Sequence, residues 1–140
     1  MASEFPINKE KEPSKTAFIG IKHFEDGRNT PLLDAIKSAV LEAGIKPYAF
    51  IDEGKFEDPH EMMRRAFQKI DESDMVILET SEPSFGVGAE AGRAFGKKPV
   101  ISLVQEGAET SGTVEGISDS FIKYKDTEDL KAKLIKALKK

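Results

Sequence analysis

The chain has 140 residues, of which 39% are hydrophobic and 33% charged, as expected for one domain with an ordinary core. Its formal net charge of −4, with acidic and basic side chains interspersed, leaves no basic face for nucleic acid. The absence of cysteine excludes disulfides and thiolate chemistry, and two histidines without a ligand cluster argue against a metal site.

The first 15 residues are polar and lack the apolar core of a signal peptide. We predict a disordered tail over residues 1–15, followed by one domain over residues 16–140. No apolar run approaches the length that crosses a bilayer. We therefore expect a cytoplasmic protein that does not bind a membrane.

Short apolar runs alternate with amphipathic stretches, which predicts alternating strands and helices. In chain order we expect a strand at 16–21, a helix capped by Asn29 or Thr30, a strand at 46–51, a polar loop at 52–58 long enough to reach over a site, a helix capped by Asp58, a strand at 75–80, a short helix, a strand at 100–104, a loop at 105–118, a strand at 120–124 and a helix capped by Asp126 or Thr127.

This alternation predicts an α/β fold, a Rossmann-like or flavodoxin-like three-layer sandwich with a five-stranded parallel sheet in the order 2-1-3-4-5. Open sheets of this kind bind ligands where the strand order reverses, at the carboxyl ends of the strands. The loops after the first and third strands, residues 20–28 and 81–90, are therefore the expected site.

The loop after the third strand, Pro83-Ser-Phe-Gly-Val-Gly, can offer backbone N–H groups and a serine hydroxyl to an anion such as phosphate. The alternative is that its glycines only permit a tight turn and close packing of helix and sheet.

One turn into the following helix lies Glu90, whose carboxylate could attack a sugar carbon or stabilise an oxocarbenium-like transition state. It could also be a solvated residue near the helix N-terminus. Arg93, three residues later, could orient Glu90 or form an ordinary surface ion pair.

Three stretches, Asp74–Glu79, Pro83–Ala94 and Gly96–Ile101, resemble the signature of the nucleoside 2-deoxyribosyltransferase superfamily. The sequence from Pro83 to Glu90 is most similar to the 2′-deoxynucleoside 5′-phosphate N-hydrolase branch, whose members cleave deoxynucleoside monophosphates to base and deoxyribose 5-phosphate. The resemblance implies an enzyme without metal or organic cofactor that forms a homodimer or a higher homo-oligomer.

By this resemblance Glu90 occupies the nucleophile position and Gly20 the glycine of the first loop. Ser84, Gly86 and Gly88 occupy phosphate-binding positions. A hydroxyl residue from a neighbouring subunit completes the phosphate pocket in the family, and Ser111 and Thr113 are the candidates here. His23 stands where the family has an arginine and could donate to a phosphate when protonated, with Lys22 as an alternative.

Two expected side chains are absent. The tyrosine of the first-strand motif is replaced by Ala17, and the aspartate that protonates the leaving base is replaced by Ala66. General acid assistance is typically worth about 10²–10⁴ in rate. Asp52, Glu53 or Asp58 could supply the proton from the loop after the second strand.

The leading hypothesis is hydrolysis of the N-glycosidic bond of nucleoside or deoxynucleoside 5′-monophosphates. The alternatives are a catalytically silent nucleotide-binding or sensor protein and a deoxyribosyltransferase. A flavodoxin-like or receiver-like signalling domain is a third interpretation, although the acidic cluster used in magnesium-dependent phosphorylation is missing. The preferred base and sugar stay open.

Overall fold

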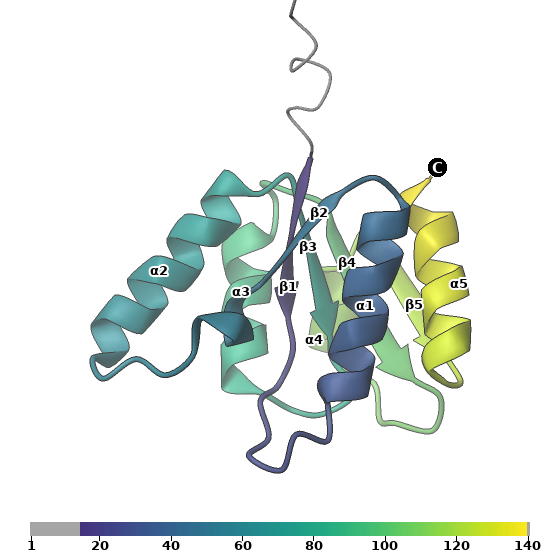
Figure 1. Ribbon diagram of the computed structural model, residues 1–140, viewed down its shortest axis with the longest axis horizontal. Coiled ribbons are helices and arrows are strands. Elements are labelled where there is room, and N and C mark those ends of the chain that lie inside the picture. The colour runs from purple at the N-terminus through teal and green to yellow at the C-terminus, as the bar shows by residue number, and fades with distance from the viewer. Residues whose placement is uncertain (1–14, 140) are drawn as a thin grey trace, which may run out of the picture.

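The computed structural model describes residues 15–139, which form a five-stranded parallel sheet with helices on both faces (Figure 1). The strands are β1 (Thr16–Gly20), β2 (Lys46–Ala49), β3 (Met75–Glu79), β4 (Val100–Gln105) and β5 (Ser120–Tyr124). The helices are α1 (Thr30–Glu42), the 3₁₀ helix η2 (Phe50–Glu53), α2 (Pro59–Glu72), α3 (Phe85–Ala94), α4 (Gly112–Gly116) and α5 (Thr127–Leu138). The predicted tail lies outside the described residues, apart from residue 15.

The strand order is β2-β1-β3-β4-β5, which confirms the predicted fold class and topology. β1 and β3 are neighbours, and Gly20 at the end of β1 is paired in register with Leu78 of β3. The loops after these two strands consequently leave the sheet side by side, as the reversal of strand order requires.

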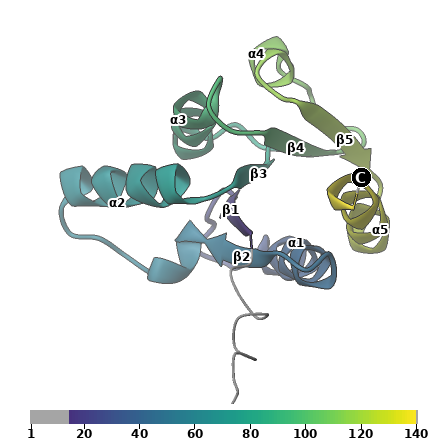
Figure 2. The same ribbon diagram turned by 90° about the horizontal axis from the view of Figure 1, so that it is seen from above.

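The two faces of the sheet carry separate halves of the core. Ile19 and Ile77 point towards α1 and α5, whereas Phe18 and Val76, one residue earlier on the same strands, point towards α2 and α3 (Figure 2). This alternation follows from the two-residue period of a strand, and both faces are apolar because helices cover both. The α2–α3 face is the one that carries the predicted site.

Helix caps agree with the sequence at two places. The Asp58 side chain accepts a hydrogen bond from the backbone N–H of His60, and Asp126 caps α5 by accepting from the N–H of Asp129. At α1 the N-cap is Asn29, but its side chain makes no cap bond and instead donates to the Lys22 carbonyl at 3.0 Å. Asn29 thus fixes the loop after β1.

The structure departs from the prediction by more than one residue at two places. The second strand ends at Ala49 rather than residue 51, because Phe50 turns into η2 and stacks on Phe18 with ring centroids 6.2 Å apart. The loop predicted at 105–118 contains α4, whose N-cap Ser111 accepts from the N–H of Thr113 at 3.2 Å. A five-residue helix is too short to show a hydrophobic period in the sequence.

Between residues 15 and 139, no helix has both the length and the apolar character that a membrane span requires.

Leu134 tests the α1–α5 half of the core, since its side chain is completely buried. Leu134→Ala should lower the free energy of unfolding by about 2–5 kcal/mol, through lost apolar contact and the cavity left behind. Leu41→Ala is the matched control: Leu41 is 62% exposed, and its truncation should change stability by no more than about 0.5 kcal/mol. Urea denaturation measures both, and equal losses would contradict this description of the core.

Candidate functional site

The predicted nucleophile, Glu90, is a buried carboxyl group on the inner side of α3, with only 8% of the residue exposed. Its Oε1 has no hydrogen-bond partner among the described residues. The carboxyl lies against the backbone of Gly20: a Cβ added there would overlap Glu90 Oε1 and stand 2.7 Å from Leu78 Cδ2. Gly20 is therefore needed because the Glu90 carboxyl occupies the space that a side chain would take.

Burial raises the pKa of Glu90 to about 8, and no charged neighbour contributes to this shift. The folded protein therefore keeps the carboxyl largely protonated at neutral pH. A carboxylate formed there has no hydrogen bond at Oε1 and no cation beside it among the described residues. A positive charge that develops next to it would therefore be strongly stabilised.

Glu90 opens onto a cavity of about 520 Å³ that we call the aromatic cavity. Gly20 and His23 also line it. Its far wall is aromatic, because the rings of Phe50 and Phe56 stack there with centroids 5.6 Å apart and an interplanar angle of 18°. A flat, hydrophobic ring fits such a wall.

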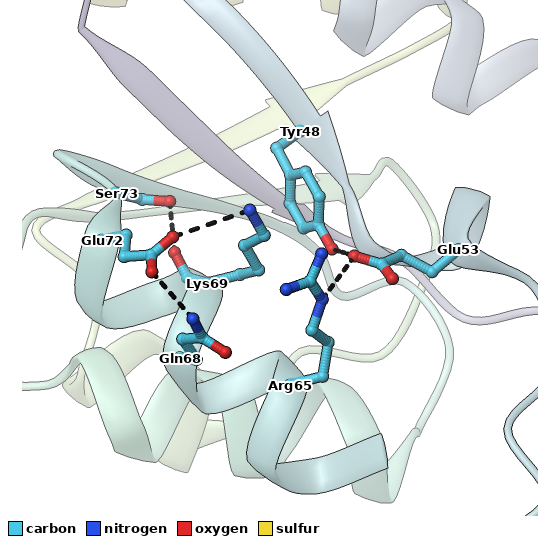
Figure 3. Close-up of polar contacts among 7 residues, drawn as sticks. All are labelled: Tyr48, Glu53, Arg65, Gln68, Lys69, Glu72 and Ser73. Atoms are coloured by element: carbon cyan, nitrogen blue, oxygen red, sulfur yellow. Dashed lines mark hydrogen bonds and ion pairs between the residues drawn. The ribbon is translucent and has the colours of Figure 1, made fainter. Parts of the chain in front are cut away.

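The wall is fixed by a polar cluster at the back of η2 (Figure 3). Glu53 of η2 accepts hydrogen bonds from the Tyr48 hydroxyl of β2 and, at 2.9 Å, from Nε of Arg65 on α2. Lys69 adds its ammonium 5.0 Å from the centre of the Tyr48 ring. Burial, followed by the bond to Glu53, raises the pKa of Tyr48 above its ordinary value, so the hydroxyl stays a donor. The cluster ties η2 to β2 and α2.

The carboxylates proposed as substitute acids have other partners. Glu53 belongs to the cluster just described, Asp52 pairs with Lys37 at 2.6 Å, and Asp58 caps α2. Ala66, where the family has its acid, is buried in α2. The ionisable residues that line the aromatic cavity are His23, Lys55 and Glu90, so its lining includes no second carboxyl group.

A second cavity, also about 520 Å³, is lined by the loop before α3 and by the segment around α4, and we call it the hydroxyl cavity. Ser84, Gly88, Ser111 and Thr113 all line it, within one chain. Ser84 is the N-cap of α3 and accepts from the Val87 N–H at 3.2 Å. The first-turn N–H groups of a helix have no intrahelical acceptor, which leaves donors available at this end of α3.

Charges around the hydroxyl cavity are mixed. Glu82 and Glu109 line it, whereas Lys22 extends its ammonium to the Pro83 carbonyl, at 3.0 Å, next to Ser84. Lys22 therefore joins the loops after β1 and β3 and supplies a cation at the edge of this cavity.

The nearby arginines do not orient Glu90. Arg93 forms two hydrogen bonds with Asp71 of α2, at 2.6 and 3.0 Å, which lowers the pKa of Asp71. Arg28 pairs with Asp26 at 2.9 Å within its own loop. Of the two interpretations of Arg93, the surface ion pair is the correct one.

Another buried carboxylate, Glu79, orders the carboxyl end of β3. It accepts hydrogen bonds from the Tyr124 hydroxyl and from both the N–H and the hydroxyl of Ser81, at 3.0 and 2.5 Å. Ser81 in turn accepts from the Gln105 N–H at 2.8 Å. This network fixes the start of the loop that reaches Ser84, and the sequence alone gave no reason to expect it.

The predicted residues thus divide between two cavities: Gly20, His23 and Glu90 line the aromatic cavity, and Ser84, Gly88, Ser111 and Thr113 line the hydroxyl cavity. Gly86 lies in the first turn of α3 and is part of neither lining. Sequence reasoning missed four residues of the aromatic cavity: Phe50, Lys55, Phe56 and Met62. The available signal was the loop predicted at 52–58 to reach over a site, which contains Lys55 and Phe56 and follows Phe50 closely in the sequence.

No family model matches the chain. A protein of Syntrophotalea carbinolica named Putative 2′-deoxynucleoside 5′-phosphate N-hydrolase 1 is 32% identical over 85 residues, which are 60% of this chain and 59% of that protein. The match therefore spans less than two thirds of the relative's length.

Solved structures share the fold. The CMP N-glycosidase of Clostridium botulinum superposes with a TM-score of 0.68 and 21% identity, over 86% of this chain and 97% of the other. The 2-deoxyribosyltransferase of Bacillus psychrosaccharolyticus gives a TM-score of 0.67 and 14% identity, over 85% and 95%. An archaeal flavodoxin superposes with a TM-score of 0.54 and 10% identity, over 89% of this chain and 99% of the other. The Syntrophotalea carbinolica relative agrees with the resemblance seen in the sequence, and the solved structures share the fold.

Gly20→Ala tests the close packing of the Glu90 carboxyl against the Gly20 backbone. The added methyl group should push the carboxyl towards solvent, lower its pKa from about 8 towards the ordinary 4.5, and destabilise the protein by about 1–3 kcal/mol. Gly92→Ala, on the outer side of α3 with open space around it, should leave the pKa unchanged. Carboxyl-carbon NMR titration measures the pKa, and an unshifted value in Gly20→Ala would contradict this close packing.

The raised pKa also predicts how stability depends on pH. Between pH 4.5 and about 8 the folded protein retains a proton on Glu90 that the unfolded chain has released, so the free energy of unfolding falls as pH rises through this window. Removing the ionisable group in Glu90→Gln removes this contribution. The variant should gain stability relative to the wild type by on the order of a few kcal/mol between pH 4 and pH 9. A pH-independent difference in urea denaturation would contradict the shift.

Proposed function

We propose that this protein hydrolyses the N-glycosidic bond of nucleoside 5′-monophosphates, with Glu90 as the nucleophile. The observation that carries the proposal is the buried Glu90 carboxyl, without a hydrogen-bond partner at Oε1 among residues 15–139, facing a cavity with an aromatic wall. The name of the Syntrophotalea carbinolica relative and the activity of the Clostridium botulinum structure support this class of reaction.

The two cavities suit the two ends of such a substrate. The base stacks in the aromatic cavity, against Phe50 and Phe56, while the phosphate lies in the hydroxyl cavity. There the hydroxyls of Ser84 and Thr113 and the first-turn N–H groups of α3 donate to phosphate oxygens, with the Lys22 ammonium close by. Residues of α3 line both cavities, with Glu90 in one and Gly88 in the other. The sugar, which joins base and phosphate, therefore lies along the N-terminal turns of α3 and presents C1′ to Glu90.

In the first step an oxygen of the ionised Glu90 carboxylate attacks C1′, and the base departs with the electron pair of the N-glycosidic bond and takes up a proton from water. Positive charge develops on the sugar ring beside a carboxylate that has little solvation, which stabilises the transition state more than the ground state. Water then cleaves the glycosyl ester and regenerates Glu90. Transfer of the sugar to a second base, as in a deoxyribosyltransferase, differs only in the acceptor of this second step.

A silent nucleotide-binding protein is the second candidate, and one observation favours it. The lining of the aromatic cavity offers no carboxyl group besides Glu90 that could protonate a leaving base. In that case nucleotides would bind and remain intact.

Self-association stays a prediction. Ser111 and Thr113 of the same chain already line the cavity with Ser84, so the hydroxyl group does not require a neighbouring subunit. Phe85 and Phe95 at the two ends of α3 are exposed and offer apolar surface to a second copy.

The test of the proposal is release of free base from a panel of ribonucleoside and deoxynucleoside monophosphates. The wild type should release base, and Glu90→Ala and Glu90→Gln should lose about 10³-fold or more, because neither variant has a nucleophile. Glu128→Gln, an exposed glutamate of α5, is the matched control and should keep full activity. The kcat/KM of the wild type should rise with pH, with a midpoint near the free-enzyme pKa of about 8.

Equal release by the wild type and Glu90→Ala would reject Glu90 as nucleophile. Titration calorimetry that shows tight binding of a nucleotide that stays intact would favour the silent binder.

A further inference from the structure

At the end of the aromatic cavity where the base is proposed to bind, the charged side chain is a lysine, which offers hydrogen-bond donors and no acceptor. Phe50, Phe56 and Met62 supply its apolar surface, and Lys55, directly before Phe56, supplies an ammonium group. An ammonium group has three donors and no acceptor. A base that stacks on Phe56 therefore meets a donor-only side chain at its edge.

Lys55 is available for such a contact. Among the described residues it takes part in no ion pair or side-chain hydrogen bond, whereas Lys37 of α1 and Lys69 of α2 pair with Asp52 and Glu72. Gly54, with φ of 85°, turns the chain immediately before Lys55 and ends η2. The Glu53 cluster holds η2 in place, so the segment that carries Lys55 starts from a fixed position.

Acceptors for an exocyclic amino group are scarce at this end of the cavity. Of the four carboxylates in residues 52–58, Asp52, Glu53 and Asp58 are engaged with Lys37, with the Tyr48–Arg65 pair and with the cap of α2. The fourth, Glu57, is not part of the cavity lining. Glu90 is reserved for the sugar under the proposed function. Bases differ in this respect: guanine presents O6 and N7 acceptors and thymine or uracil an O4 acceptor, whereas adenine and cytosine present amino donors at the same place.

We propose that Lys55 makes the site selective for 6-oxopurines and 4-oxopyrimidines over the corresponding amino bases. The ammonium donates to the exocyclic carbonyl oxygen, and in a purine also to N7. An amino group in that position presents a donor to the ammonium. Cytosine then offers the ammonium no acceptor on that edge, and adenine offers N7 alone, which disfavours both amino bases. This inference rests on the proposed function for the placement of the base, and it adds the substrate class and the residue that selects it.

The test compares kcat/KM for dGMP against dAMP and for dUMP against dCMP. The wild type should prefer the oxo base of each pair by about tenfold or more, the size expected for a hydrogen bond to a charged group. Lys55→Met should lower kcat/KM for dGMP and dUMP about 10- to 100-fold and change dAMP and dCMP by less than about threefold, which removes the preference. Lys55→Arg keeps the charge and should retain the preference.

Two controls separate Lys55 from a general loss of charge or structure. Lys46→Met, at the amino end of β2 and away from the cavity, should leave all four substrates unchanged. His23→Gln should lower kcat/KM for all four substrates by the same factor, so that the dGMP:dAMP and dUMP:dCMP ratios stay unchanged. A wild-type preference for amino bases, an equal loss on all four substrates in Lys55→Met, or ratios that move only in His23→Gln would each overturn the inference.

Failure of the proposed function remains distinguishable from failure of this inference. If the wild type releases no base, the same four nucleotides are titrated calorimetrically. Tighter binding of dGMP and dUMP that disappears in Lys55→Met would support the role of Lys55 in a silent binder. Equal binding of the four, or no binding of any, would overturn it.

Discussion

The site depends on one constraint, the burial of the Glu90 carboxyl against a strand end that has no side chain. Gly20 ends β1 in the interior of the sheet, and α3 crosses above it closely enough that any Cβ would overlap the carboxyl. Removal from water raises the pKa of Glu90 to about 8 and leaves Oε1 without a partner among residues 15–139. Such a group is costly to ionise until a cationic centre forms beside it, which bond cleavage at C1′ would provide under the proposed function.

The strand order places the two cavities around this carboxyl. Because β1 and β3 are neighbours, the loops that follow them meet, and Lys22 bonds the Pro83 carbonyl across the junction. The end of β2 contributes the aromatic wall, and the connection after β4 contributes Ser111. The apolar cavity and the hydroxyl-lined cavity both include residues of α3, and under the proposed function they take the aromatic and the anionic end of the substrate.

The fold could be predicted from the sequence, because alternating apolar runs and helix caps are local signals for strands and helices. A few rules on how such elements connect then determine the strand order. Glu90, Ser84 and Gly88 were found from a contiguous motif. The missed aromatic wall is brought to the site by tertiary contacts, since Phe50 turns away from β2 to stack on Phe18. Glu53 was named from the sequence only as a candidate acid, and its pairing with Arg65 from another helix is likewise a tertiary contact. The requirement for glycine at position 20 likewise depends on a contact with Glu90, which lies 70 positions away in the sequence.

The central claim, that Glu90 forms a bond to the sugar, is tested most directly by trapping the intermediate with a 2′-deoxy-2′-fluoroarabinonucleoside 5′-monophosphate. The fluorine slows both steps by destabilising positive charge on the ring, and a good leaving base allows the first step to proceed. Mass spectrometry should find the intact protein heavier by one fluorinated sugar phosphate, carried on the peptide that contains Glu90. Release of base without an adduct, or an adduct on another residue, would contradict the account.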